Sequence, residues 1–214
     1  MKPVLLILCA ALAACLYLVG LALDLFWLKL LTKPWPVLAL AAAVWSRAGT
    51  DRRIAWGLLA GAAGDVCLAL PHAFLPGMIA FAVGHGLYVA AFLRWNRRPA
   101  LVLLAPVAVY AGTGLWLMLP GAGALAPPLV VYVLIIAAMI WRAAACALAS
   151  RAHPLVRWGP LAGALLFGFS DTLIGIHRFA QPLPGAAFAI ILTYWAAQAL
   201  FAATAIERRR PAAE

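Results

Sequence analysis

Long apolar stretches, separated by short polar or basic segments, run along the whole 214-residue chain. A helix needs roughly 20 apolar residues to cross the hydrocarbon core of a bilayer, and somewhat fewer where the bilayer adapts. Such runs predict eight helical spans, at 4–23, 34–45, 54–70, 73–93, 101–119, 125–141, 158–177 and 184–206. The pattern therefore predicts an all-α, polytopic membrane protein with one transmembrane domain over residues 1–214.

The composition excludes a water-soluble fold. Hydrophobic residues make up 67% of the chain and charged residues only 10%, whereas soluble domains average about 45–50% and about 25%. A soluble chain of this length cannot bury so much apolar surface. The 4 cysteines lie inside apolar stretches without metal-ligand spacing, so we interpret them as small hydrophobic residues.

The basic residues predict the orientation. When the predicted spans alternate across the bilayer, thirteen of the 16 Lys and Arg residues fall on the side of the N-terminus. Lys29, Lys33 and Arg178 fall on the other side. Positive residues are retained in the cytoplasm, so we expect both termini to be cytoplasmic and the protein to lie in a bacterial inner (plasma) membrane. Topology thus accounts for the net charge of +10, and no nucleic-acid partner is expected.

Two acidic residues, Asp65 and Asp171, lie within predicted spans. Each costs about 2.5–3.5 kcal/mol near a helix centre, and an ionisable group inside the membrane is a functional candidate by default. The two spans run in the same direction, and at 1.5 Å per residue both acids lie about 7–9 Å below the outer boundary. No Lys or Arg inside a span is expected to pair with them. We therefore predict that the two acids share a cavity.

Helical stripes indicate which way these residues point. Small residues share a stripe with each acid: Gly57, Gly61 and Gly64 with Asp65, and Ala164, Gly168 and Gly175 with Asp171. Small residues let helices approach closely, so both acids are expected to face the bundle interior. His85 and Tyr88 share a stripe on the fourth span. A core histidine bonded to a backbone carbonyl, and simple aromatic packing, are the alternative interpretations of that stripe.

The chain also contains a loose internal repeat. Gly64-Asp65…His72…Phe81…Tyr88 resembles Ser170-Asp171…His177…Phe188…Tyr194. Each half then holds four spans, and an even number makes the halves parallel, related by an axis along the membrane normal. The repeat predicts two acids in equivalent positions that face one another.

Several segments resemble the signatures of the YhhN family, over about residues 32–200. The first signature is Gly64-Asp65-Val66-Cys67-Leu68, followed by Phe74-Leu75-Pro76-Gly77-Met78-Ile79-Ala80-Phe81-Ala82-Val83-Gly84-His85-Gly86-Leu87-Tyr88. The second is Phe169-Ser170-Asp171-Thr172-Leu173, with Arg178-Phe179, Tyr194 and Gln198 after it. Thr32-Lys33-Pro34 is similar to a Lys-Pro element of the family. The ordered set is more specific than any one piece.

The resemblance implies eight helices and catalysis by the two aspartates. Members of the family studied as enzymes are lysoplasmalogenases, which hydrolyse the vinyl ether of lysoplasmalogens to a fatty aldehyde and a glycerophospho-base. Protonation of the terminal alkene carbon gives an oxocarbenium ion, water adds, and the hemiacetal collapses to aldehyde and alcohol. Glycoside hydrolysis passes through a related cation with one protonated acid and one carboxylate. Two aspartates in a low-dielectric cavity supply that combination, and no metal or other cofactor is required.

We accordingly expect Asp65 and Asp171 to form an acid/base pair, with the individual roles left open. His85 and Tyr88 are expected to orient water or the leaving oxygen. Lys33 and Arg178 are candidates for holding the phosphate of a lysophospholipid substrate, with snorkelling to membrane lipids as the alternative. The remaining candidate substrate contacts are Ser170, Tyr194 and Gln198.

Other functions compete with this one. Inward-facing acids at matched depth also describe a proton-coupled transporter, although paired Gly/Pro interruptions within the spans are not evident. A metal-dependent lipid hydrolase is a second alternative, but His72, His85 and His177 lie at different depths in the predicted helices. A non-catalytic scaffold is a third, and it leaves the buried acids unexplained.

Overall fold

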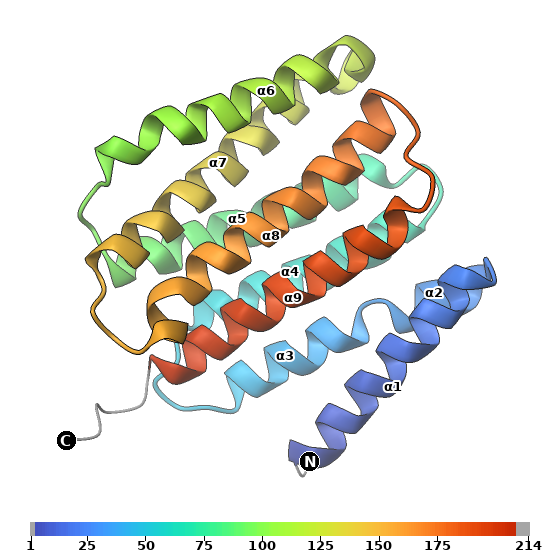
Figure 1. Ribbon diagram of the computed structural model, residues 1–214. Helices are drawn as coiled ribbons and strands as arrows, with labels where there is room; N and C mark the ends of the chain where they lie inside the picture. The colour runs from blue at the N-terminus through green and yellow to red at the C-terminus, as the bar shows by residue number, and fades with distance from the viewer. Residues whose placement is uncertain (1–2, 209–214) are drawn as a thin grey trace.

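The computed structural model describes residues 3–208, and every regular element in that range is helical. Lys2, Arg209, Arg210 and Glu214, which entered the charge analysis, lie outside it. The elements are α1 (Pro3–Ala22), α2 (Phe26–Thr32), α3 (Trp35–Trp45), α4 (Arg52–Ala69), α5 (Phe74–Trp95), η1 (Leu101–Leu103), α6 (Leu104–Ala122), η2 (Gly123–Leu125), α7 (Ala126–Ala149), α8 (Pro154–Phe179) and α9 (Ala186–Glu207) (Figure 1).

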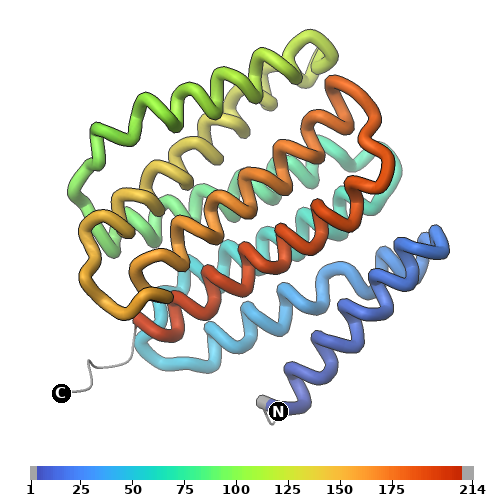
Figure 2. The backbone as a smooth tube through the Cα atoms, in the orientation of Figure 1, coloured from blue at the N-terminus to red at the C-terminus, as the bar shows by residue number. Residues whose placement is uncertain are grey.

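The helices form a bundle in which consecutive long helices run back and forth (Figures 1 and 2). The most extensive contacts are between α8 and α9 and between α4 and α5. Helices distant in sequence also meet, since α5 packs on α7 and α3 on α9. Helix α1 lies at the edge of the bundle, against α2 and α3. This packing brings α4, α5, α7, α8 and α9 around a common interior.

The chain is a membrane protein by the length and composition of its helices. Within the described range, 5 helical stretches satisfy both criteria for a span: Val4–Ala22, Phe74–Trp95, Leu101–Ala149, Pro154–Phe179 and Ala186–Glu207. The third contains both α6 and α7, joined by η2. All eight predicted segments are helical, but α3 has 11 residues and is only about 16 Å long. The count of eight crossings therefore stays a prediction.

Burial follows the pattern expected in a bilayer rather than in water. Large apolar side chains face outward, as at Val109 and Trp116, where 68% and 75% of the residue is exposed. Polar side chains such as Gln198 and His85 are fully buried. Because lipid solvates apolar groups, apolar side chains cover the outside of the bundle and polar side chains are buried within it.

The predicted end of the sixth span at residue 141 is wrong, because α7 continues to Ala149. The alanine-rich segment after Arg142 favours helix and prolongs it. Arg142 is consequently not in a loop. It is buried, and its guanidinium donates through Nη1 and Nη2 to the backbone carbonyls of Arg98 and Asn96.

A short helix, α2, was not predicted, and it positions the Lys-Pro element. The hydroxyl of Thr32 donates to the carbonyl of Leu28 at 2.5 Å inside this helix. Pro34 then caps α3, and Pro36 lies in its first turn, where proline is tolerated. Lys33 stands at the corner between the two helices, and only 16% of its side chain is exposed.

Candidate active site

Asp65 of α4 is buried among polar partners from two other parts of the chain. The Tyr194 hydroxyl of α9 donates to its Oδ2 at 2.8 Å. The Lys33 ammonium lies 3.3 Å from its Oδ1. The expectation that no intramembrane cation pairs with the acids is therefore wrong for Asp65. The sequence placed Lys33 outside the spans, but the α2–α3 corner lets its long side chain extend into the bundle.

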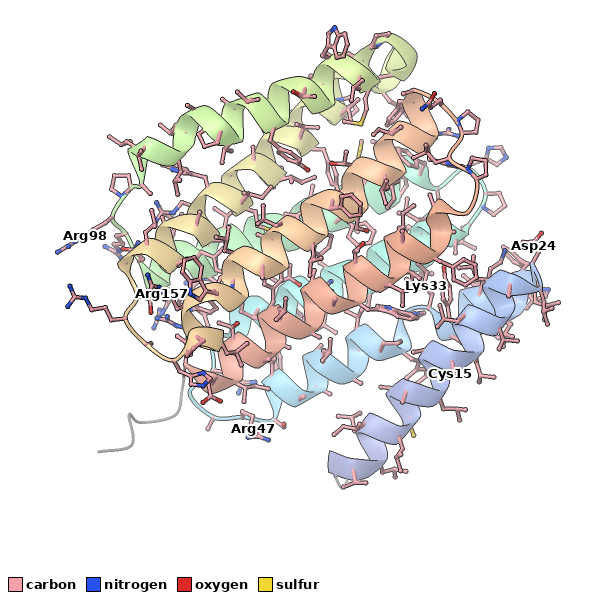
Figure 3. The ribbon with its side chains drawn as sticks, viewed as in Figure 1. Cys15, Asp24, Lys33, Arg47, Arg98 and Arg157 are labelled. Carbon is pink, nitrogen blue, oxygen red and sulfur yellow. The ribbon has the colours of Figure 1, made fainter. Side chains whose placement is uncertain are left out.

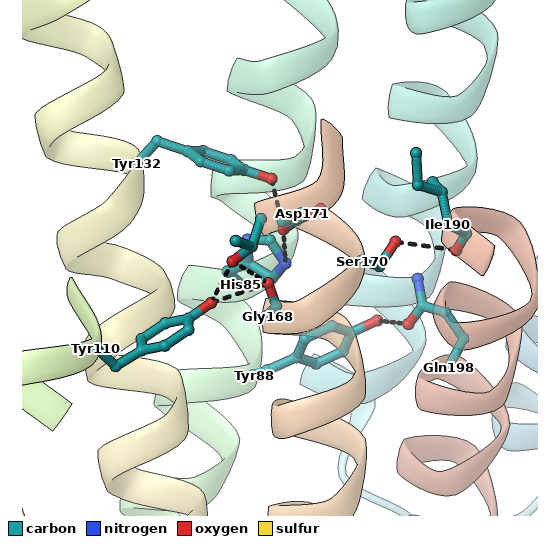
Figure 4. Close-up of polar contacts among 10 residues, drawn as sticks. His85, Tyr88, Tyr110, Tyr132, Gly168, Ser170, Asp171, Ile190 and Gln198 are labelled. Atoms are coloured by element: carbon teal, nitrogen blue, oxygen red, sulfur yellow. Dashed lines mark hydrogen bonds and ion pairs between the residues drawn. The ribbon is translucent and has the colours of Figure 1, made fainter. Parts of the chain in front are cut away.

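Asp171 of α8 has different partners (Figure 4). The Tyr132 hydroxyl of α7 donates to its Oδ2 at 2.8 Å. The same oxygen lies 3.5 Å from Nε2 of His85 on α5. No Lys or Arg forms an ion pair with Asp171 within residues 3–208. The two acids thus differ in charge compensation, although both are buried and both accept a tyrosine hydroxyl.

His85 is a fully buried polar side chain. Neither of its ring nitrogens makes a hydrogen bond within the described part of the chain. Its ring packs against those of Phe81 and Phe167, at centroid distances of 6.5 and 4.4 Å. An imidazole in such surroundings can donate from one nitrogen and accept at the other. It is therefore suited to orient a small polar molecule beside Asp171.

A cavity of about 50 Å³ opens beside Asp171, between α5, α6, α7 and α8. Its wall is mostly apolar, with Met78, Phe81, Met118 and Leu129 among the lining residues. The few polar groups that line it gather near the acid: Asp171, Tyr110, Tyr132 and Thr172. An apolar cavity with a few convergent polar groups is typical of a site for a small or lipid-like ligand.

Asp65 does not line this cavity, and the two carboxyl groups keep separate partners. An aromatic layer of Phe81 and Phe167 lies between the two groups of residues. The Tyr194 ring, which belongs to the Asp65 group, is 5.7 Å from the Phe81 ring and 5.2 Å from the Phe167 ring. The same two rings also pack on His85, which lies beside Asp171. The two phenylalanines therefore contact the residues around both acids.

The small-residue stripe on α4 permits this close packing. A Cβ atom on Gly64 would lie 2.6 Å from the Phe81 ring, and one on Gly61 would lie 2.6 Å from Nε2 of Gln198. The expectation that these glycines let helices approach is confirmed at both positions. Tyr88 donates to Oε1 of Gln198 at 2.6 Å, so that pair lies on the α4–α9 side rather than beside Asp171 (Figure 4).

The last two candidate substrate contacts lie elsewhere on α8. Ser170 is buried, and its hydroxyl donates to the carbonyl of Ile190 at 3.0 Å, which ties α8 to α9. Arg178 is exposed, and its guanidinium lies 5.2 Å from the ring centroid of Phe74. Since Phe74 lines the cavity, Arg178 stands at the rim of the cavity.

The histidines that the metal alternative invoked are not gathered. Within residues 3–208, no three or more His, Cys, Asp or Glu side chains form a group that could hold a metal ion. Nδ1 of His177, for example, accepts from the backbone nitrogen of Leu183 at 2.9 Å.

Three polar residues near Asp171 were not predicted as site residues: Tyr132, Tyr110 and Thr172. The Tyr110 hydroxyl donates to the carbonyl of Gly168 at 2.9 Å and lies 2.7 Å from the Thr172 hydroxyl. A signal existed, because a tyrosine in the middle of an apolar span must find a partner for its hydroxyl. The partner itself could not be predicted, since it belongs to another helix.

These observations define a class: a helical membrane protein with a buried carboxyl group beside an apolar cavity. The sequence profile of the YhhN family matches residues 28–205, and the chain belongs to this family. It is 39% identical to human lysoplasmalogenase TMEM86B, over 88% of the chain and 80% of the relative. It is 40% identical to the pig lysoplasmalogenase TMEM86B, over 81% and 74%.

A bacterial relative is also similar. The chain is 34% identical to a lysoplasmalogenase of Mycobacterium bovis, over 78% of the chain and 66% of the relative. No solved structure gives a significant match.

Proposed function

We propose that this protein hydrolyses the vinyl ether bond of lysoplasmalogens and releases a fatty aldehyde and a glycerophospho-base. The observation that carries the proposal is Asp171, a buried carboxyl group on the wall of an apolar cavity. The relatives named lysoplasmalogenase support the substrate class.

The proposed reaction begins with a proton that moves from a carboxylic acid to the alkene carbon that is not bonded to the ether oxygen. This step leaves an oxocarbenium ion and a carboxylate. Water then adds to the cation and gives up a proton, which yields a hemiacetal. When the hemiacetal collapses, the bond between its carbon and the glycerol oxygen breaks. The hydroxyl proton passes to that oxygen, which gives the aldehyde and the alcohol. The site must therefore supply an acid, a negative charge that stabilises the cation, and a position for water.

The surroundings of the acids support a division of labour between them. Asp171 is assigned as the general acid, because it lines the cavity and has no ammonium or guanidinium partner within the described residues. Asp65 is assigned as the permanent carboxylate, because Lys33 compensates its charge at 3.3 Å. Its negative charge stabilises the cation through the low-dielectric aromatic layer.

The other polar groups act around Asp171. Tyr132 fixes the carboxyl group through its 2.8 Å hydrogen bond. His85 orients the attacking water, since its Nε2 lies 3.5 Å from Asp171 and its ring has no hydrogen-bond partner of its own in the described range. Tyr88, Tyr194 and Gln198 hold the Asp65 side of the site in place.

The cavity suggests how the lipid binds. The alkenyl chain lies along the apolar wall, with its vinyl ether carbon at Asp171. The phosphate lies at the rim, where Arg178 is exposed beside Phe74. Lys33 is a weaker candidate for the phosphate than the sequence indicated, because Asp65 already compensates its charge.

We also propose eight membrane crossings with both termini in the cytoplasm of a bacterial cell. Arg47, Arg98 and Arg157 lie toward one end of the bundle, whereas Lys33 and Asp24 lie toward the other (Figure 3). This asymmetry supports the orientation. In the proposed orientation, the Asp171 cavity lies in the half of the membrane away from the cytoplasm.

The function is tested by measuring aldehyde release from purified protein. One sample is incubated with lysoplasmalogen and a parallel sample with its saturated ether analogue. We expect aldehyde release from the vinyl ether only, because the saturated ether has no alkene carbon to protonate. Aldehyde from neither lipid contradicts the proposed activity, and cleavage of both contradicts the proposed mechanism. Flux of lipid across proteoliposomes without aldehyde would favour the transporter alternative.

A further inference from the structure

A second concavity lies at the opposite end of the bundle, where the α3–α4 connection meets the ends of α5 and α9. Its volume is about 530 Å³. Four arginines and two indole rings line it: Arg52, Arg53, Arg94, Arg208, Trp56 and Trp95. Nothing in the proposed hydrolysis uses these residues.

One carboxylate, that of Asp51, also lines the concavity and pairs with two of the four arginines. Its Oδ1 caps α4 by accepting from the backbone nitrogen of Arg53, and it lies 3.3 Å from the Arg53 guanidinium. Its Oδ2 lies 4.0 Å from Nε of Arg94. The acid therefore holds two arginines toward the concavity without balancing all four, and the lining keeps an excess of positive charge.

Tryptophan rings hold the other two guanidinium groups. Arg208 lies 4.7 Å from the ring centroid of Trp95, and Arg52 lies 4.6 Å from that of Trp45. Trp45 in turn packs edge-on against Trp56 at 5.2 Å, and both of these indoles are partly exposed. Tryptophan is enriched at the level of lipid head groups. The concavity thus combines arranged guanidinium groups with apolar surface at head-group depth.

This concavity is separate from the candidate active site. Arg52 begins α4, whereas Asp65 lies about four turns further along the same helix, which corresponds to about 20 Å. The two sites therefore cannot hold the same small head group.

We propose that the concavity binds the phosphate group of an anionic phospholipid. Guanidinium groups bind phosphate oxygens with paired hydrogen bonds, and basic pockets between membrane helices bind anionic head groups. Free phosphate offers the same chemistry to the arginines. The exposed faces of Trp45 and Trp56 favour the lipid, since they provide apolar contact for the glycerol and acyl chains next to the phosphate.

Native mass spectrometry tests this site. It measures how much short-chain phosphatidylglycerol binds to the purified protein in neutral detergent. The variant Arg94→Gln/Arg208→Gln removes two lining charges. Its matched control, Arg97→Gln/Arg151→Gln, removes two exposed arginines that do not line the concavity. We expect roughly tenfold weaker binding for the first variant and unchanged binding for the control. Lysoplasmalogen turnover is expected to stay the same in both.

Three results would overturn the proposal. The first is that Arg94→Gln/Arg208→Gln binds phosphatidylglycerol as tightly as the unaltered protein does. The second is that the control variant loses as much affinity as Arg94→Gln/Arg208→Gln, which would mean that binding depends on general surface charge. The third is displacement of the lipid by inorganic phosphate at similar concentration, which would indicate a site for free phosphate. Weaker binding of phosphatidylcholine than of phosphatidylglycerol would support the anionic lipid.

Discussion

Asp65 and Asp171 are the same residue type, each on a helix with small neighbours and each bonded to a tyrosine hydroxyl at 2.8 Å. Their surroundings nevertheless differ. Asp65 has an ammonium partner and does not line the cavity described above, whereas Asp171 has an imidazole neighbour and lines that cavity. Partners from other helices, rather than the acid itself, therefore decide which carboxyl group can meet a ligand.

The partners cross between the two halves of the chain. Asp65 on α4 bonds to Tyr194 on α9, and Asp171 on α8 approaches His85 on α5. A parallel internal repeat would set the α4–α5 pair against the α8–α9 pair, but Tyr88, the repeat equivalent of Tyr194, donates to Gln198 and not to Asp171. The repeat itself stays a prediction. If the site arose by duplication, the different partners of Asp65 and Asp171 are what we expect when the two halves take different roles.

The strongest test of the comparison is Asp171→Asn. We expect turnover of lysoplasmalogen to fall by about 10²–10⁴-fold, because the amide cannot deliver the proton. Aldehyde release by the purified variant measures the loss, and a thermal unfolding scan checks that the protein is folded.

Asp24→Asn is the matched control. This acid is exposed, and the hydrogen bond from Lys29 lowers its pKa. Because Asn also tolerates the positive φ of 53° at this position, we expect full activity. Near-normal turnover of Asp171→Asn would rule out Asp171 as the acid.

Removing the cation from the other acid should act mainly on stability. Lys33→Met leaves the Asp65 carboxylate buried without counter-charge, which costs about 3–5 kcal/mol of unfolding free energy. Thermal unfolding in detergent measures this loss. The double variant Lys33→Met/Asp65→Asn should regain most of it, because no charge is then left alone.

The double variant also separates folding from catalysis. We expect it to be folded but impaired in turnover, because the stabilising negative charge is gone. A Lys33→Met protein with unaltered unfolding temperature would mean that the 3.3 Å ion pair has no structural importance.

The two tyrosines provide a matched pair of smaller changes. Tyr132→Phe removes the hydrogen bond to Asp171, and we expect turnover to fall roughly tenfold, since one bond to a charged group is worth about 1.5–3 kcal/mol. Tyr194→Phe removes the equivalent bond to Asp65 and should reduce turnover less, because Lys33 still holds that carboxylate. The turnover rates of the two variants, measured under identical conditions, show which of them loses more activity. A larger loss in Tyr194→Phe would reverse the assigned roles of the two acids.

The smallest effect is expected at Ser170, next to the acid in sequence. Its hydroxyl bonds to the carbonyl of Ile190 rather than lining the cavity. Ser170→Ala should therefore lower the unfolding free energy by about 1 kcal/mol and change KM for lysoplasmalogen less than twofold. A KM increase of tenfold without loss of stability would instead support the substrate contact that the sequence indicated.

Much of the site could be predicted because the relevant signals are local. A carboxyl group within an apolar span stands out by its cost, as Asp65 and Asp171 do, and glycine spacing on α4 indicated a close helix contact that Phe81 provides. The end of α7 was missed because the hydrophobic pattern stops at a charged residue. The helix continues through Arg142, whose guanidinium is received by carbonyls of a distant loop that the local pattern could not reveal.

The sequence by itself determined that this chain enters a membrane as helices, since apolar run length and a period of 3.6 residues are properties of each segment alone. Its family signatures likewise marked both acids. The tertiary structure alone decided that Lys33 compensates Asp65, and that Tyr132 and a cavity belong to Asp171. Those contacts join segments far apart in the chain, and which side chains meet there depends on how the helices pack.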